Sequence, residues 1–267
     1  MELLEHFVRG KRADQSLCED GWVFTPDFAA VVDGSTSKLP GGHGGRTAMQ
    51  LVCEALRTLH AGADRREMLE TLTRAIAWHN PPGARSMGVY RLTCSAVIYS
   101  RARRVVWMVG DCQCRFGGRT VTHPKWVDTV LAEARCDVLR ALLAEGHGVE
   151  ALRERDLGRA VIADALRTQT NFQNDTNPYN PFRYPVLDGF PVDEAQVPEW
   201  PVGQADRLVL ASDGYPVLCD TLRDTEGELR RLLRADPLCM AEMAGTKAWM
   251  KGNDSYDDRC YLSITLG

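Results

Sequence analysis

Short apolar runs along the chain predict β-strands that come in adjacent pairs. Residues 22–24 and 28–32 are rich in valine and aromatic or small apolar side chains, and the turn-forming stretch Thr-Pro-Asp separates them. Residues 92–100 and 104–110 form a second pair joined at Arg-Ala-Arg. The stretch QCRFGGRTV is expected to add a strand that turns at Gly117–Gly118. Two more strands are predicted at 207–211 and 259–266.

Apolar residues spaced three and four positions apart predict helices between the strands. After a glycine-rich loop, residues 46–60 carry such a pattern. A second helix is predicted at 65–78, where the stretch Asn-Pro-Pro-Gly ends it. The remaining helices are predicted at 125–145, 149–171, 226–234 and 237–249. Paired strands with helical pairs between them favour an antiparallel α+β layered fold over a βαβ alternation.

The segment 174–201 differs from the rest, because it is rich in asparagine, proline and aromatic residues. It is predicted to be a long surface excursion. Two interpretations stay open: a recognition surface, or an ordered loop that packs on the domain.

Composition narrows the class of protein. The 267 residues are 44% hydrophobic and 25% charged, which fits a full-sized core, and we expect a single domain over 1–267. The net charge of −4 gives no basic field for nucleic acid or an anionic membrane. No apolar run is long enough to span a membrane, and no signal peptide is recognised. The nine cysteines, without a CxxC pair, favour buried thiols in the cytoplasm.

Several apolar runs end at an aspartate next to a glycine. FAAVVDG ends at Asp33, VVWMVGD at Asp111, and LVLASDGY contains Asp213; Asp257 and Asp258 precede the last predicted strand. Each Asp-Gly alone is a favoured turn dipeptide. Several carboxylates at one place repel one another unless a cation neutralises them. Oxygen ligands favour Mg²⁺, Mn²⁺ or Ca²⁺, so we expect two divalent ions that share a water.

The order of these motifs resembles the metal-dependent protein phosphatase family, type 2C. The matching positions are Arg12 with Asp14, VVDG, Gly45-Arg46-Thr47-Ala48, MVGD, ASDG and Asp257-Asp258. The resemblance covers nearly the whole chain. It implies a four-layer α-β-β-α sandwich of two mainly antiparallel sheets flanked by helical pairs, with the metal ions at one end. It also implies a Mg²⁺- or Mn²⁺-dependent serine/threonine phosphatase that acts, as a monomer, on phosphorylated proteins.

The resemblance implies roles for individual residues. The metal ligands that it implies are Asp33, which bridges two ions, the carbonyl of Gly34, Asp213, Asp257 and, for a weaker third ion, Asp111. Arg12 would grip the substrate phosphate with its forked guanidinium. Asp14 would hold a water on the metal ions, and Glu19 and Asp20 are alternatives for that role.

Two departures from the family pattern affect these roles. The stretch DGSTSKLPGGHGG resembles the family's glycine-rich turn with several residues added, and His43 within it is a candidate general acid. The alternative is a flexible loop with a solvated histidine. GDCQC places Cys112 and Gln113 where relatives often have serine and arginine, which puts the third ion in doubt.

Three other functions compete with that of a type 2C phosphatase. VVDGST faintly resembles the haloacid-dehalogenase-type phosphatases, but Val31 occupies the position of their nucleophile and cannot attack phosphorus. A catalytically silent relative that binds phosphoproteins or a partner, and an interaction domain with structural metal ions, are the other two alternatives. Metal-dependent turnover distinguishes both from an enzyme.

Overall fold

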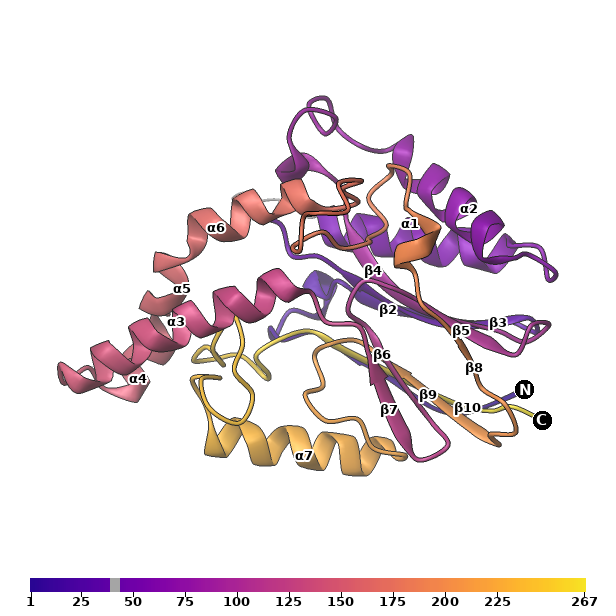
Figure 1. Ribbon diagram of the computed structural model, residues 1–267. Helices are drawn as coiled ribbons and strands as arrows, with labels where there is room; N and C mark the ends of the chain where they lie inside the picture. The colour runs from indigo at the N-terminus through magenta and orange to yellow at the C-terminus, as the bar shows by residue number, and fades with distance from the viewer. Residues whose placement is uncertain (39–43) are drawn as a thin grey trace.

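Two antiparallel sheets of five strands each form the centre of the molecule. The computed structural model describes residues 1–38 and 44–267 (Figure 1). One sheet has the order β1-β10-β9-β6-β7 and the other β2-β3-β4-β5-β8. The strands are β1 Glu2–Arg9, β2 Asp20–Phe24, β3 Phe28–Gly34, β4 Cys94–Ser100, β5 Val105–Val109, β6 Gln113–Phe116, β7 Arg119–Thr122, β8 Glu199–Pro201, β9 Arg207–Ala211 and β10 Arg259–Thr265. The predicted α+β class is confirmed.

The central strands are apolar throughout because both of their faces are buried. In β3, Ala29 and Val31 point between the two sheets, while Ala30 and Val32 point to the helices on the outer side. Strand β4 is buried along its whole length. A continuous apolar run is the pattern that such a doubly covered strand requires, and the strand end is therefore held rigidly by the core.

Helices cover the outer faces of the sandwich. Helices α1 Gly44–Thr58 and α2 Arg65–Ala77 pack on the sheet that contains β3, and α7 Leu222–Ala235 packs on the other sheet (Figure 1). The N- and C-termini lie together at one end, where Glu2 pairs with Thr265. No helix within residues 1–38 and 44–267 has the length and apolar character needed to cross a membrane.

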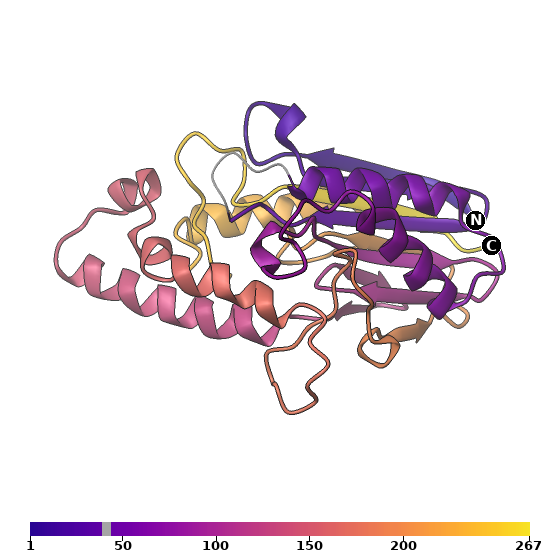
Figure 2. The same ribbon diagram turned by 90° about the horizontal axis from the view of Figure 1, so that it is seen from above.

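A second group of helices extends from the end of the sandwich opposite the termini (Figure 2). It contains α3 Trp126–Ala144, α4 Val149–Glu154, α5 Leu157–Val161 and α6 Ala163–Thr168. The single helix predicted at 149–171 is thus broken into short pieces. Asp156 causes one break, because its carboxylate accepts the backbone N–H of Arg159 and caps α5.

The prediction of a helix at 237–249 is wrong. The segment forms a loop whose carbonyls at Leu238, Cys239 and Gly245 accept hydrogen bonds from the buried guanidinium of Arg135. The carboxylate of Asp236 accepts the N–H groups of Met240, Ala241 and Met243. Because side chains satisfy these backbone groups, the segment needs no helical hydrogen bonds.

The segment 174–201 packs on the domain as an ordered loop. Leu187 pairs with Cys94 at the end of β4, and Asn174 donates to the buried carboxylate of Asp188, which also accepts from Arg91. Its last residues form strand β8, which pairs with β5. The cysteines, all of which lie in the described part of the chain, are free thiols, and all but Cys219 are buried.

Candidate active site

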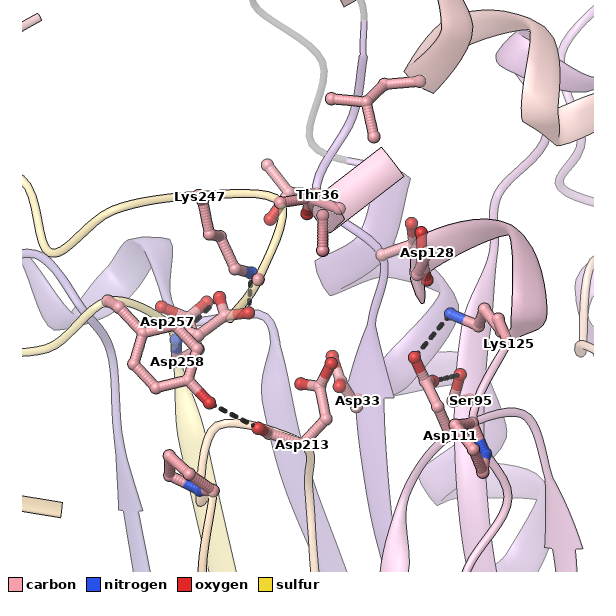
Figure 3. Close-up of a pocket in the computed structure, with 18 of the residues that line it drawn as sticks. Asp33, Thr36, Ser95, Asp111, Lys125, Asp128, Asp213, Lys247, Asp257 and Asp258 are labelled. Atoms are coloured by element: carbon pink, nitrogen blue, oxygen red, sulfur yellow. Dashed lines mark hydrogen bonds and ion pairs between the residues drawn. The ribbon is translucent and has the colours of Figure 1, made fainter. Parts of the chain in front are cut away.

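Three of the predicted carboxylates meet at the end of the sandwich next to α3. Asp33 ends β3, Asp111 lies between β5 and β6, and Asp213 follows β9 (Figure 3). One carboxylate oxygen from each of them lies within 4.8 Å of the others. The two sheets contribute to the cluster together, since β3 and β9 belong to different sheets. The strands that carry these residues are buried in the core, and their packing places the carboxylates side by side.

The charges of these carboxylates are not balanced equally. Burial raises the pKa of Asp33 well above its usual range, and the charges of Asp20 and Asp213 raise it further. Enclosure in the pocket and the charge of Asp111 likewise raise the pKa of Asp213. The charges of Lys247 and Lys125 oppose the rise at Asp213 without cancelling it. The charged forms of Asp33 and Asp213 are therefore compensated only in part, which is the electrostatic state that a bound cation relieves.

Asp111 has its own counter-charge. Burial alone would raise its pKa, but Lys125, whose Nζ lies 2.7 Å from Oδ2, lowers the pKa below the usual range. The hydroxyl of Ser95 donates to Oδ1 over 2.7 Å. Both oxygens of Asp111 are thus engaged by protein groups.

Asp20 lies beside Asp33, directly opposite it in the pairing of β2 with β3. It is buried, and its Oδ2 has no hydrogen-bond partner among the described residues. Burial raises the pKa of Asp20 to about 7, and the charges of Asp258 and Asp213 add to the effect. The sequence named Asp20 only as an alternative. Its position opposite Asp33 on a short hairpin is the signal that favours it.

Asp257 and Asp258 lie in the same pocket but are held by lysines. The ammonium of Lys11 lies 2.9 Å from Oδ1 of Asp257, and Lys247 forms an ion pair with Oδ2 (Figure 3). Asp258 accepts the N–H groups of Lys11 and Glu19, over 2.8 Å and 3.0 Å. Asp257 is therefore near the carboxylate cluster without belonging to it.

The other predicted residues have different surroundings. Asp14 is exposed, and its carboxylate accepts from the N–H and hydroxyl of Ser16, so it caps a short turn instead of joining the cluster. Arg12 is exposed at the rim of the pocket, with no side-chain partner among the described residues. His43 lies outside the described residues. Gly34 ends β3 next to the backbone of α1, where an added Cβ would lie 2.3 Å from the carbonyl oxygen of Gly45.

One pocket of about 820 Å³ is lined by Arg12 and by five of these carboxylates, Asp33, Asp111, Asp213, Asp257 and Asp258, whereas the buried Asp20 lies behind its wall. Besides the carboxylates, its walls include cations that the sequence did not indicate, because an isolated lysine or arginine has no recognisable spacing. They are Lys11, Lys38, Lys125, Arg159 and Lys247. An anionic substrate can thus be attracted to a site whose centre is acidic.

Comparison with known protein families shows which family the chain belongs to. The family described as protein phosphatase 2C matches residues 9–242. The chain belongs to this family. A search of curated proteins finds no match.

Solved structures that are similar to this chain include serine/threonine phosphatases. The catalytic domain of the serine/threonine protein phosphatase PstP in complex with two manganese ions is 15% identical, and the match covers 100% of both chains with a TM-score of 0.50. The phosphatase Stp1 from Staphylococcus aureus is 14% identical, with 100% and 98% covered and a TM-score of 0.48. PstP/Ppp of Mycobacterium tuberculosis is 17% identical, with 98% and 97% covered and a TM-score of 0.45. At these identities the likeness shows the fold alone.

One departure from the protein phosphatase 2C pattern has a structural role in this chain. Gln113 donates through Nε2 to the carbonyls of Ser212 and Tyr215, over 3.1 Å and 2.6 Å. It therefore holds both sides of the turn that carries Asp213. Tyr256 donates to the carbonyl of Asp213 over 2.6 Å. The position of Asp213 is set by these bonds as well as by β9.

Proposed function

We propose that this protein phosphatase 2C member is a phosphatase dependent on Mg²⁺ or Mn²⁺ that hydrolyses phosphoserine and phosphothreonine in proteins. The observation that carries the proposal is the meeting of Asp33, Asp111 and Asp213 within one pocket. Family membership supports the same activity. Among the described residues, no cation forms an ion pair with Asp33 or Asp213, and Arg12 has no side-chain partner that would keep it from holding a phosphate.

The donor set fits hard divalent cations. Carboxylate and carbonyl oxygens are the ligands that Mg²⁺ and Mn²⁺ prefer, and Oδ2 of the buried Asp20 has no partner that the described residues supply. Asp33, Asp213 and the carbonyl of Gly34 would hold the two ions. Asp257 completes this set where an ion displaces Lys11 and Lys247. Since Lys125 already neutralises Asp111, we propose no third ion.

When bound, the divalent ions lower the pKa of a water molecule and offset negative charge on the phosphoryl oxygens. The protein's own groups position the reactants. Arg12 at the pocket rim holds the phosphoryl oxygens through its guanidinium. Asp20, which lies next to Asp33, takes the role for which Asp14 was a candidate. Oδ2 of Asp20 has no hydrogen-bond partner among the described residues, so it is available to hold a water molecule at the ions.

A catalytically silent phosphoprotein-binding domain is the competing function. The observation in its favour is that Lys125, Lys11 and Lys247 already neutralise Asp111 and Asp257. In such a domain the lysines would replace the metal charge permanently, and the protein would bind phosphorylated partners without hydrolysing them.

Turnover of p-nitrophenyl phosphate and a phosphothreonine peptide, measured with Mn²⁺, with Mg²⁺ and with a chelator, decides between the two functions. We expect metal-dependent turnover that falls at least about 100-fold in Asp213→Ala. Asp137→Asn is the matched control, because Asp137 is exposed on α3 outside the pocket. If folded wild-type protein hydrolyses neither substrate with either metal, the phosphatase proposal fails.

A further inference from the structure

A group of cations lines one part of the pocket, which we call the cationic wall: Lys38, Arg159 and Lys247. They come from three separate segments, the chain after β3, helix α5 and the loop between α7 and β10. Their side chains share one pocket with the carboxylate cluster. None of the three was recognised from the sequence as a site residue.

Hydrogen bonds join the cationic wall to the metal centre. Lys38 donates through Nζ to the carbonyl of Thr36 over 3.0 Å, and the Thr36 hydroxyl accepts from Lys11 over 3.1 Å. Arg159 donates to the carbonyl of Thr246 over 2.6 Å, directly before Lys247 in the chain. Lys11 and Lys247 both form ion pairs with Asp257, and Asp33 lines the same pocket (Figure 3). The wall is thus built from ordered, mutually connected residues.

Lys38 and Arg159 differ from the other cations of the pocket in their ion pairs. Lys11, Lys125 and Lys247 each form an ion pair with an aspartate. Within residues 1–38 and 44–267, no carboxylate oxygen lies within ion-pair distance of Lys38 or Arg159, and the side-chain hydrogen bonds of these two residues go to Thr36 and Thr246. Neither cation therefore has an ion pair with a carboxylate of the described residues, and the negative charges that act on them, Asp128 on both and Asp156 on Arg159, offset their charge only in part.

Burial makes it unfavourable for Lys38 and Arg159 to carry a positive charge without an ion-pair partner. Burial lowers the pKa of Lys38 to about 7, and the nearby positive charges of Arg159, Lys247 and Lys125 contribute to the shift, while Asp128 opposes it. Burial also lowers the pKa of Arg159. Like charges held together in a poorly solvated place repel one another, and a bound anion relieves that repulsion.

We propose that Lys38 and Arg159 form a subsite for a second anionic group of the substrate, next to the phosphoester at the metal centre. The preferred substrate is then a phosphoserine or phosphothreonine whose neighbouring residue is acidic or is itself phosphorylated. This inference rests on the proposed phosphatase function. It is supported by the pocket volume of about 820 Å³, which leaves room for residues beside a phosphorylated side chain.

Three phosphothreonine peptides that differ at one neighbouring residue test the subsite: asparagine, aspartate or phosphoserine. Wild-type protein with Mn²⁺ is expected to show kcat/KM roughly tenfold higher for the two anionic peptides than for the asparagine peptide, mainly through a lower KM. The aspartate and phosphoserine peptides show whether carboxylate or phosphate is the better ligand. In Lys38→Met and in Arg159→Gln, the ratio of kcat/KM between an anionic peptide and the asparagine peptide is expected to fall towards one.

The matched control is Lys251→Met, because Lys251 is exposed, pairs with Glu154 and lies outside the pocket. Its peptide preference is expected to equal that of the wild type. Equal kcat/KM for all three peptides in the wild type would overturn the subsite while leaving the phosphatase intact. So would an equal loss for all three peptides in both variants, which would place Lys38 and Arg159 at the phosphoryl group itself.

If the wild-type protein hydrolyses none of the peptides, the proposed function fails, and binding then decides on the subsite alone. Calorimetric Kd values for the three peptides provide that measurement. We expect tighter binding of the two anionic peptides, lost in Lys38→Met, and an equal Kd for all three would overturn the subsite.

Discussion

At the scale of single residues, close contacts between backbones require glycine at Gly34 and Gly214, which follow Asp33 and Asp213. An added Cβ at Gly214 would lie 2.0 Å from the carbonyl oxygen of Asp258. We therefore expect Gly214→Ala to lower the free energy of unfolding by about 2 kcal/mol or more and to displace Asp213. Thermal denaturation and Mn²⁺ binding measure the two effects.

Gly227 provides the matched control, because it lies within α7 and an added Cβ there would meet no atom within 4 Å. Gly227→Ala is expected to raise the free energy of unfolding by about 0.5–1 kcal/mol through its effect on helix propensity. If both substitutions change stability equally, the close approach at Gly214 is not what requires glycine there.

The site residues that sequence could predict are those that follow a buried strand. Asp33, Asp111 and Asp213 each stand beside a strongly apolar run, so the core that fixes the strand also fixes the carboxylate. Asp14 lies in no such run, and the structure places it away from the cluster. Lys38 and Arg159 come together only through tertiary contacts, which leave no local pattern in the sequence.

At the scale of elements, one buried ion pair holds the loop between α7 and β10 against α3 and α5. Arg135 is fully buried, pairs with Asp156 at 2.9 Å and donates to three loop carbonyls. Arg135→Met removes the cation that pairs with Asp156 and that donates to those three carbonyls, and it leaves the Asp156 carboxylate with only the N–H groups of Arg159 and Ala248. We expect the free energy of unfolding, measured by urea denaturation, to fall by about 3–5 kcal/mol.

The comparison for this prediction is Arg140→Met on the same helix. Arg140 is exposed and pairs with the exposed Asp137, so its loss is expected to change the free energy of unfolding by less than about 1 kcal/mol. Equal effects of the two substitutions would show that the loop does not depend on Arg135.

Helices and strands could be predicted from the sequence where a regular pattern of apolar residues reflects the faces that are buried. Strand β9 has the predicted bounds of 207–211, since its apolar run is buried nearly throughout. Strand β1 was missed because it lies at a sheet edge with alternate residues exposed. The helix predicted at 237–249 failed because Arg135, more than 100 positions earlier, takes its carbonyls. A local pattern contains no sign of such a distant partner.

At the scale of the whole molecule, the uncompensated carboxylates make stability depend on pH when metal is removed. The pKa of Asp20 is about 7 in the folded protein and 3.8 without burial, and the pKa values of Asp33 and Asp213 are also raised. Between these values the folded state binds more protons than the unfolded state, so its stability falls as pH rises from 5 to 7.

Thermal denaturation in the presence of a chelator checks this prediction. We expect the Tm to fall from pH 5 to pH 7, the fall to be smaller in Asp20→Asn, and Mn²⁺ to abolish it. Above pH 7 the lowered pKa of Lys38 acts in the opposite direction, because the unfolded state then binds the additional proton. A Tm that rises from pH 5 to pH 7 in chelator would contradict the electrostatic account of the site.

The central claim is that Asp33 and Asp213 form a binding site for divalent metal ions. Calorimetric titration of chelator-treated protein with Mn²⁺ at pH 8, for the wild type, Asp213→Asn and the exposed control Asp137→Asn, tests it most directly. The account predicts saturable binding in the wild type and the control, and an affinity at least about tenfold lower in Asp213→Asn. Equal Mn²⁺ affinity in all three proteins, or no binding to folded wild type, would contradict it.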